Sequence, residues 1–164
     1  MKKPDTAHGK EFEKEVHDAF RNLYNLLPIL WERVIDTHDA GNVVRKADSD
    51  FKLTINSGLP GRPYLFFIEC KASVVYDRLT DNGARRSLIG ADQIAKMRLA
   101  MRAGVQGIFL FKSLNRSMIE VWDAAPVIEA WSKKRFKWVA EPAGEVALAD
   151  LDTWAEKFIQ EYLK

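Results

Sequence analysis

The chain of 164 residues is 47% hydrophobic and 29% charged, which suits one globular domain, residues 1–164, with a core of its own. A formal net charge of +2 is too small to identify a nucleic-acid partner by itself. The single cysteine, Cys70, excludes a disulfide framework and a cysteine-based structural zinc site. No stretch approaches the roughly 18 apolar residues of a membrane span, so we expect a soluble, cytoplasmic protein with no membrane partner.

The first half of the chain predicts one helix and three strands. Residues 9–27 carry apolar side chains three or four positions apart, as an amphipathic helix does. Residues 30–36 and 48–55 alternate as strands around a polar turn. The turn at residues 56–63 contains glycine and proline and leads into a third strand, residues 64–73. The apolar side of the helix consists of Phe12, Val16, Phe20, Leu23 and Leu27.

The segment after the third strand is polar, and two further strands follow it. Residues 75–90 show no periodicity and are interpreted as a long, mobile loop. Ile94, Met97 and Met101 indicate a core-facing helix that ends near Gly104. Residues 107–113 and 118–124 are expected as strands, and the first of these is apolar on both faces, as a central strand is.

The C-terminal part predicts two helices. Pro126 can open a short helix through Trp131, and Asp150 can cap a final helix that carries Leu151, Trp154, Phe158 and Tyr162 on one side. Between them, residues 135–139 are a candidate strand. The order of helix, strands, helix, strands and helix predicts an α/β fold of the α+β type, a mixed central sheet flanked by helices.

The strand "YLFFIECKAS" ends in an acid and a base. Side chains alternate along a strand, so Glu69 and Lys71 share one face while Cys70 points to the other. A structural ion pair at a strand end is the common explanation of such a triplet. Asp50 changes this interpretation, because it opens the preceding strand and two antiparallel strands can bring it beside Glu69 at one end of the sheet.

Two carboxylates and a main-chain carbonyl form a hard oxygen site. Asp50, Glu69 and the carbonyl of Cys70 would suit Mg²⁺ or Mn²⁺. Such a cation lowers the pKa of a water and stabilises charge on a phosphate, while Lys71 can orient the nucleophile or neutralise the transition state. This donor set predicts phosphodiester hydrolysis. Asp48 competes with Asp50 for the ligand position, and we favour Asp50 because the apolar strand begins directly after it.

The aspartate followed by a strand ending in Glu-x-Lys resembles the PD(D/E)xK nuclease superfamily, whose motif positions would be Asp50, Glu69 and Lys71. The segment "HGKEFEKEV" is similar to the opening helix of Holliday junction resolvases, which implies that Glu13 is a further metal ligand. The segments "GRPYLFFIECKAS" and "ADQIAKMRLAMRAGVQGIFLF" resemble the RecU branch, including phage-encoded or shortened forms. That resemblance implies a restriction-endonuclease-like core and places Gln93 on the active-site glutamine.

The resemblance implies a Mg²⁺-dependent homodimeric endonuclease that resolves four-way DNA junctions in recombination and repair. Basic residues concentrate between positions 85 and 137, and the candidate DNA contacts are Arg62, Arg85, Arg86 and Lys96. Two alternatives remain open: a restriction-type or repair endonuclease that cuts linear duplex, and a DNA-binding module whose acid and lysine are only structural. The segment "WSKKRFKW" is interpreted mainly as core aromatics with solvated lysines. His17 is interpreted as a surface helix histidine.

Overall fold

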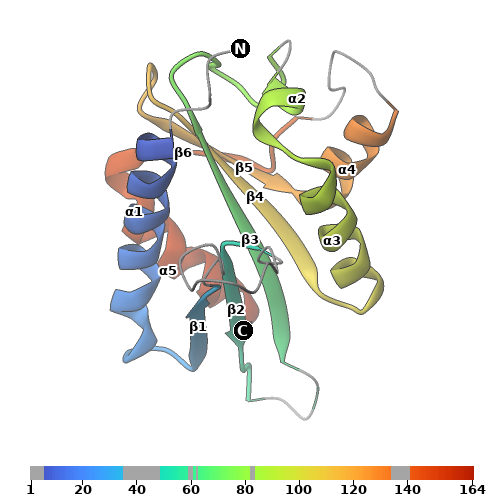
Figure 1. Cartoon of the computed structure of the whole chain (residues 1–164). Coiled ribbons are helices and arrows are strands. Elements are labelled where there is room, and N and C mark those ends of the chain that lie inside the picture. The colour runs from blue at the N-terminus through green and yellow to red at the C-terminus, as the bar shows by residue number, and fades with distance from the viewer. Residues whose placement is uncertain (1–5, 35–48, 59–60, 62, 82–83, 134–140) are drawn as a thin grey trace, which may run out of the picture.

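The computed structural model describes residues 6–34, 49–58, 61, 63–81, 84–133 and 141–164. They form one six-stranded sheet with helices on both sides (Figure 1). The strands are β1 (Ile29–Arg33), β2 (Phe51–Ile55), β3 (Tyr64–Ser73), β4 (Gln106–Ser113), β5 (Met118–Asp123) and β6 (Gly144–Ala147). The helices are α1 (Thr6–Tyr24), α2 (Ala84–Leu88), α3 (Ala91–Arg102), α4 (Ala124–Ser132), the short 3₁₀ helix η2 (Leu148–Asp150) and α5 (Leu151–Tyr162).

The strands lie in the sheet in their chain order, β1-β2-β3-β4-β5-β6. β3 and β4 are parallel and are joined through α2 and α3, whereas the other neighbouring pairs are antiparallel. The prediction of a mixed sheet flanked by helices is therefore confirmed. No helix in the described part of the chain combines the length and the apolar character that a membrane crossing requires.

The central strand β4 separates two hydrophobic clusters. Ile108 and Leu110 face the cluster formed with α1 and α5, while Phe109 and Phe111 face the cluster formed with α3 and α4. This alternation explains why β4 is apolar along nearly its whole length: both of its faces are buried. Gly107 lies where a Cβ atom would come within 2.5 Å of the Met97 sulfur, so glycine permits the close approach of α3 to the sheet.

The aromatic side of α5 closes the first cluster. Phe158 and Tyr162 pack edge-on against Phe66 of β3, with ring centroids 5.2 and 5.0 Å away. The prediction that the final helix carries its large apolar side chains on one side is thus confirmed. Asp150 occupies the residue before α5, but its side chain makes no capping hydrogen bond, so the predicted role of this carboxylate as a cap is wrong.

The structure corrects the interpretation of residues 75–90 as one long loop. This segment contains the short helix α2, and side-chain hydrogen bonds fix residues 77–79, which precede it. α4 begins at Ala124, two residues before the predicted start at Pro126. The edge strand β6 was not predicted. The candidate strand at residues 135–139 and the predicted polar turn between residues 36 and 48 lie outside the described residues.

Candidate active site

The site is built where β2 begins beside β3. Phe51 pairs with Ile68 in antiparallel register, so Asp50, one residue earlier, lies beside Glu69. β3 continues to Ser73 without β2 as a neighbour, which leaves this edge of the strand open. The main-chain N–H of Cys70 donates a hydrogen bond of 2.7 Å to Asp50 Oδ2. Asp50 and Glu69 thus lie side by side at one end of the sheet, as predicted.

Glu69 is almost completely buried, with its side chain 3% exposed, and its Oε1 atom has two donors. Lys71 Nζ lies 2.7 Å from this oxygen, and Gln93 Nε2 also donates to it. Gln93 comes from the first turn of α3, and its Oε1 atom accepts a 3.1 Å hydrogen bond from the Gly90 N–H that precedes the helix. One amide group therefore both caps α3 and holds Glu69.

Glu13 projects from α1 and binds a residue that the sequence analysis did not single out. Arg33, the last residue of β1, places its Nη2 atom 3.3 Å from Glu13 Oε2. In the sequence, Arg33 is only a charged residue near the end of a short strand, and such a residue is usually solvent-exposed. Only the folding of α1 against β1 brings this arginine to the candidate site.

Burial and neighbouring charges raise the pKa values of Asp50, Glu13 and Lys71. Burial and the negative charge of Glu69 raise the pKa of Asp50 well above its ordinary value, against the opposing effect of Lys71. Burial raises the pKa of Glu13 and Arg33 opposes that effect, while Glu69 adds to it. Burial alone would lower the pKa of Lys71, but the carboxylates of Glu69 and Asp50 outweigh it and raise this pKa. The acids therefore repel one another, and Lys71 remains protonated among them.

A buried lysine pairs with α1, the helix that carries Glu13. Lys112 of β4 is buried to 4% exposure, and its Nζ atom lies 2.5 Å from Glu15 Oε2. The same ammonium group lies 5.6 Å from the centre of the Phe12 ring. The pair therefore links α1 to β4 in addition to the apolar contacts of the helix.

His17 does not behave as a solvated surface residue, and that interpretation is wrong. Its Nδ1 atom accepts a hydrogen bond of 3.0 Å from Trp31 Nε1, and its ring stacks on Phe51 at 6.1 Å. The histidine belongs to the packing between α1 and the first strands. The Cys70 side chain is buried in the cluster under α1 and α5, on the face opposite Glu69 and Lys71, as alternation predicted. Met97 is buried, and Met101 packs against the same cluster, as predicted.

The candidate DNA contacts are described only in part. Lys96 is partly buried on α3, three residues after Gln93 and so on the same side of the helix. Arg85 and Arg86 belong to α2, but their side chains lie outside the described residues, as do Arg62 and Asp48. In the segment 131–138, Trp131 packs against the second cluster and donates to the Ile89 carbonyl, while residues 134–138 are not described.

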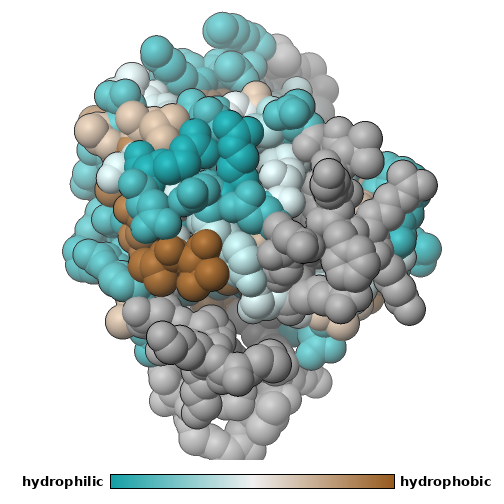
Figure 2. Space-filling model, turned by 90° about the horizontal axis from the view of Figure 1, so that it is seen from above, coloured by the Kyte–Doolittle hydropathy of each residue, from teal (hydrophilic) through white to brown (hydrophobic). Residues whose placement is uncertain are grey.

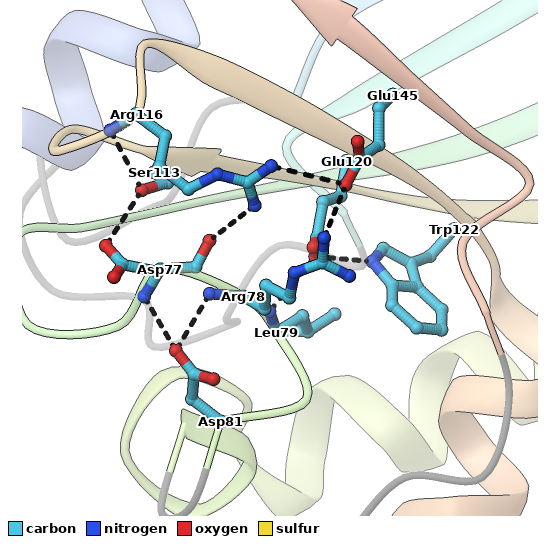
Figure 3. A network of polar contacts seen from close by, with 9 residues as sticks. All are labelled: Asp77, Arg78, Leu79, Asp81, Ser113, Arg116, Glu120, Trp122 and Glu145. Atoms are coloured by element: carbon cyan, nitrogen blue, oxygen red, sulfur yellow. Dashed lines mark hydrogen bonds and ion pairs between the residues drawn. The ribbon is translucent and has the colours of Figure 1, made fainter.

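Polar contacts fix residues 77–81, in the connection that follows β3 (Figure 3). Asp81 Oδ2 accepts hydrogen bonds from the N–H groups of Asp77 and Arg78, at 2.7 and 2.9 Å. Asp77 in turn accepts from the Asn115 side chain, and the buried Glu120 accepts from the Leu79 N–H. These contacts anchor the connection from β3 toward α2 on the β4–β5 turn.

Among the described residues, the face seen in Figure 2 is mostly hydrophilic and carries one compact hydrophobic patch. The two apolar residues that follow β3, Val74 and Val75, are 44% and 75% exposed. Asn115 donates a 2.9 Å hydrogen bond to the Val74 carbonyl, and Ser73 Oγ accepts one from the Val75 N–H. The two valines are therefore presented by an ordered backbone at the end of the strand that carries Glu69 and Lys71.

The donor chemistry of the site fits a hard divalent cation. Asp50 and Glu69 offer carboxylate oxygens side by side, and their mutual repulsion is the kind that a bound cation relieves. Within the described ranges, no three His, Cys, Asp or Glu side chains are already arranged as metal ligands. Glu13 is instead paired with Arg33. In this state the acids are balanced by protein cations and hydrogen-bond donors.

Comparison with known proteins gives no relative from which a function could be transferred. No family model matches the chain, and no curated protein matches its sequence.

Proposed function

We propose that the protein is a divalent-metal-dependent DNA endonuclease of the PD(D/E)xK type. One observation carries the proposal: four residues singled out by their order in the sequence lie together beside the start of β2. They are Asp50, Glu69, Lys71 and Gln93. An isolated Glu–Lys pair would be explained by structure alone. The second acid on the neighbouring strand and the amide aimed at Glu69 favour a chemical role for this group.

Each residue has a definite part in the proposed hydrolysis. Asp50 and Glu69, with Glu13 and the Cys70 carbonyl, would hold Mg²⁺ or Mn²⁺, which when bound supplies an activated water and stabilises charge on the phosphate. Lys71 remains protonated beside Glu69, so its ammonium group can orient the attacking water or stabilise the charge that develops on the scissile phosphate. Gln93 keeps Glu69 in one orientation.

The proposed substrate is a four-way DNA junction in recombination or repair, cut by a homodimer. A junction has two symmetric scissile strands, so a two-fold dimer would place one site on each. This part of the proposal is supported by the RecU-like order of Glu13, Asp50, Glu69, Lys71 and Gln93. Arg62, Arg85, Arg86 and Lys96 would contact the DNA backbone beside the site.

The decisive experiment compares two substrates and two variants. Purified protein is incubated with a synthetic four-way junction or a linear duplex of the same sequence, with Mg²⁺, Mn²⁺ or EDTA. We expect metal-dependent nicking of the junction, and no nicking by Asp50→Asn or Lys71→Ala variants that still fold and bind DNA. Equal cutting of both substrates would assign the protein to the restriction-type or repair alternative. Junction binding without cleavage under every condition would leave only the DNA-binding module.

A further inference from the structure

Every acid of the candidate site already has a partner within the protein. Glu69 is held by Lys71 and Gln93, and Asp50 is held by the Cys70 N–H. Glu13 is held by Arg33. A cation that uses Glu13 as a ligand must therefore compete with the guanidinium group of Arg33, which contacts Oε2 of this carboxylate.

The two cationic side chains of the site differ in how firmly they are held. The Lys71 side chain is 14% exposed and interacts with both Glu69 and Asp50, so it is enclosed between two acids. The Arg33 side chain is 55% exposed, and its partner Glu13 is 25% exposed. An exposed ion pair of this length contributes little stability and is readily exchanged. Arg33 is thus the more exposed of the two cations, and its departure leaves Glu13 still in partial contact with solvent.

We propose that Arg33 is an exchangeable counter-ion: it neutralises Glu13 in the metal-free protein and transfers to a DNA phosphate when a divalent cation takes Glu13. This inference rests on the proposed function and concerns how its two ligands are coupled. Metal binding alone leaves the guanidinium unpaired, and DNA binding alone leaves Arg33 engaged with Glu13. When both bind, Glu13 and Arg33 each gain a new partner. Arg33 thereby makes metal and DNA binding mutually favourable.

The chemistry of arginine suits this exchange. A guanidinium group is charged at every working pH, and its planar donors match a carboxylate and a phosphate equally well. Arg33 is the last residue of β1 and lies opposite Phe51, which directly follows Asp50. The released side chain therefore starts beside the acids. Coupling of this kind is reciprocal, so metal must tighten DNA binding by the same factor by which DNA tightens metal binding.

The first test measures Mn²⁺ binding by calorimetry to the full chain without DNA. Arg33→Gln removes the internal competitor, so we expect its Mn²⁺ affinity to exceed that of the wild type by about 2- to 5-fold, the range of an exposed ion pair. Lys14→Gln is the matched control. Lys14 lies on the exposed side of α1, the helix that carries Glu13, and its Nζ atom pairs with Asp18 at 2.7 Å. This variant removes the same charge and should leave the affinity unchanged.

The second test measures the coupling. Fluorescence anisotropy gives the affinity for a four-way junction with phosphorothioate linkages, which resist hydrolysis, with and without Mn²⁺ at constant ionic strength. We expect Mn²⁺ to tighten junction binding by the wild type, and to do so by a smaller factor in Arg33→Gln. Arg33→Lys keeps the charge without the planar fork and should fall between them.

The outcomes separate this inference from the proposed function. Equal Mn²⁺ affinity of the wild type and Arg33→Gln, or equal tightening of junction binding in both, would overturn the exchange while the nuclease proposal stands. A wild type that binds no divalent cation, with or without DNA, would overturn the nuclease proposal and the exchange together. Higher metal affinity with weaker coupling in Arg33→Gln, and neither change in Lys14→Gln, supports the exchange.

Discussion

The carboxylate of Asp50 accepts a 2.7 Å hydrogen bond from the main-chain N–H of Cys70, which ties the start of β2 to the strand that carries Glu69 and Lys71. This bond keeps two acids close together although their charges repel. The arrangement stabilises little in the metal-free protein, since the pKa of Asp50 is raised by burial and by Glu69. Charge repulsion of this kind lowers the stability of the folded protein.

Asp50→Asn is expected to stabilise the metal-free protein at neutral pH. Because the pKa of Asp50 is raised on folding, the folded state binds its proton more readily than the unfolded chain. Between the unfolded pKa of about 3.9 and the raised folded pKa, this group therefore lowers the free energy of unfolding as pH rises. Asparagine removes the effect and can still accept the Cys70 N–H. Urea denaturation in EDTA at several pH values measures the difference.

The stabilisation by Asp50→Asn should disappear below about pH 4, where the wild-type carboxylate is protonated in both the folded and the unfolded state. Metal-dependent cleavage should be lost in the same variant. Asp18→Asn is a suitable control, because Asp18 lies on the exposed side of α1 and pairs with Lys14. A variant at Asp50 that is less stable than the wild type at pH 7 would contradict the charge repulsion inferred here.

Lys71→Met tests the buried pair. Glu69 is 3% exposed, so removal of the ammonium group leaves a buried charge with Gln93 as its remaining side-chain donor. We expect a loss of about 3 kcal/mol in the free energy of unfolding in EDTA, as found when one member of a buried pair is removed. The double variant Glu69→Gln, Lys71→Met should recover most of this loss, because the charge of Glu69 is removed together with that of its partner. Equal losses in the single and double variants would argue against the pair.

Gln93→Glu separates the two contacts of one side chain. A glutamate can still accept the Gly90 N–H that precedes α3, but it presents a negative charge where Gln93 now donates to Glu69. We expect the variant to keep its helix content, measured by circular dichroism, and to lose about tenfold or more in cleavage rate. Gln93→Ala loses both contacts and should also be less stable. Full activity of Gln93→Glu would show that the amide has no part in the reaction.

Most of the fold follows from local patterns. The apolar runs of β3 and β4 each identify a strand, and the periodicity of α1, α3 and α5 identifies each of these helices with its buried side. β6 was missed because its sequence, "GEVA", is short and only partly buried, so it has no alternating pattern to detect. α2 is a single short turn of "ARRSL" inside a polar segment. Such elements form because of the contacts around them, and not because of their own propensity.

The site was predictable as far as neighbouring strands determine it. Asp50 and Glu69 meet because an antiparallel pair fixes its own register, and Lys71 shares the face of Glu69 by alternation. The contact of Arg33 with Glu13 depends on how α1 crosses β1, and no spacing in the sequence encodes that angle. The same holds for the packing of His17 on Trp31 and Phe51. Long-range side-chain contacts decide which charges surround the predicted acids.

Glu120 supports the rigid connection after β3, and its replacement tests that support. Its Oε2 atom accepts hydrogen bonds of 3.0 Å from the Leu79 N–H and from Trp122 Nε1 (Figure 3). Its Oε1 atom is buried and has no partner among the described residues. Glu120→Ala leaves two buried donors unsatisfied, and each such donor costs about 1–3 kcal/mol. Glu120→Gln keeps an acceptor for both donors and removes a buried charge.

We therefore expect urea denaturation to give a large loss of unfolding free energy for Glu120→Ala and a clearly smaller one for Glu120→Gln. Hydrogen exchange should become faster at the Leu79 amide in the alanine variant, because that amide loses its acceptor. Glu145→Gln is the control at the protein surface, since Glu145 pairs with Arg78 and Arg116 at 3.5 and 3.6 Å and contributes little as an exposed ion pair. If Glu120→Ala were as stable as Glu145→Gln, the connection would be held by the Asp77 and Asp81 contacts instead.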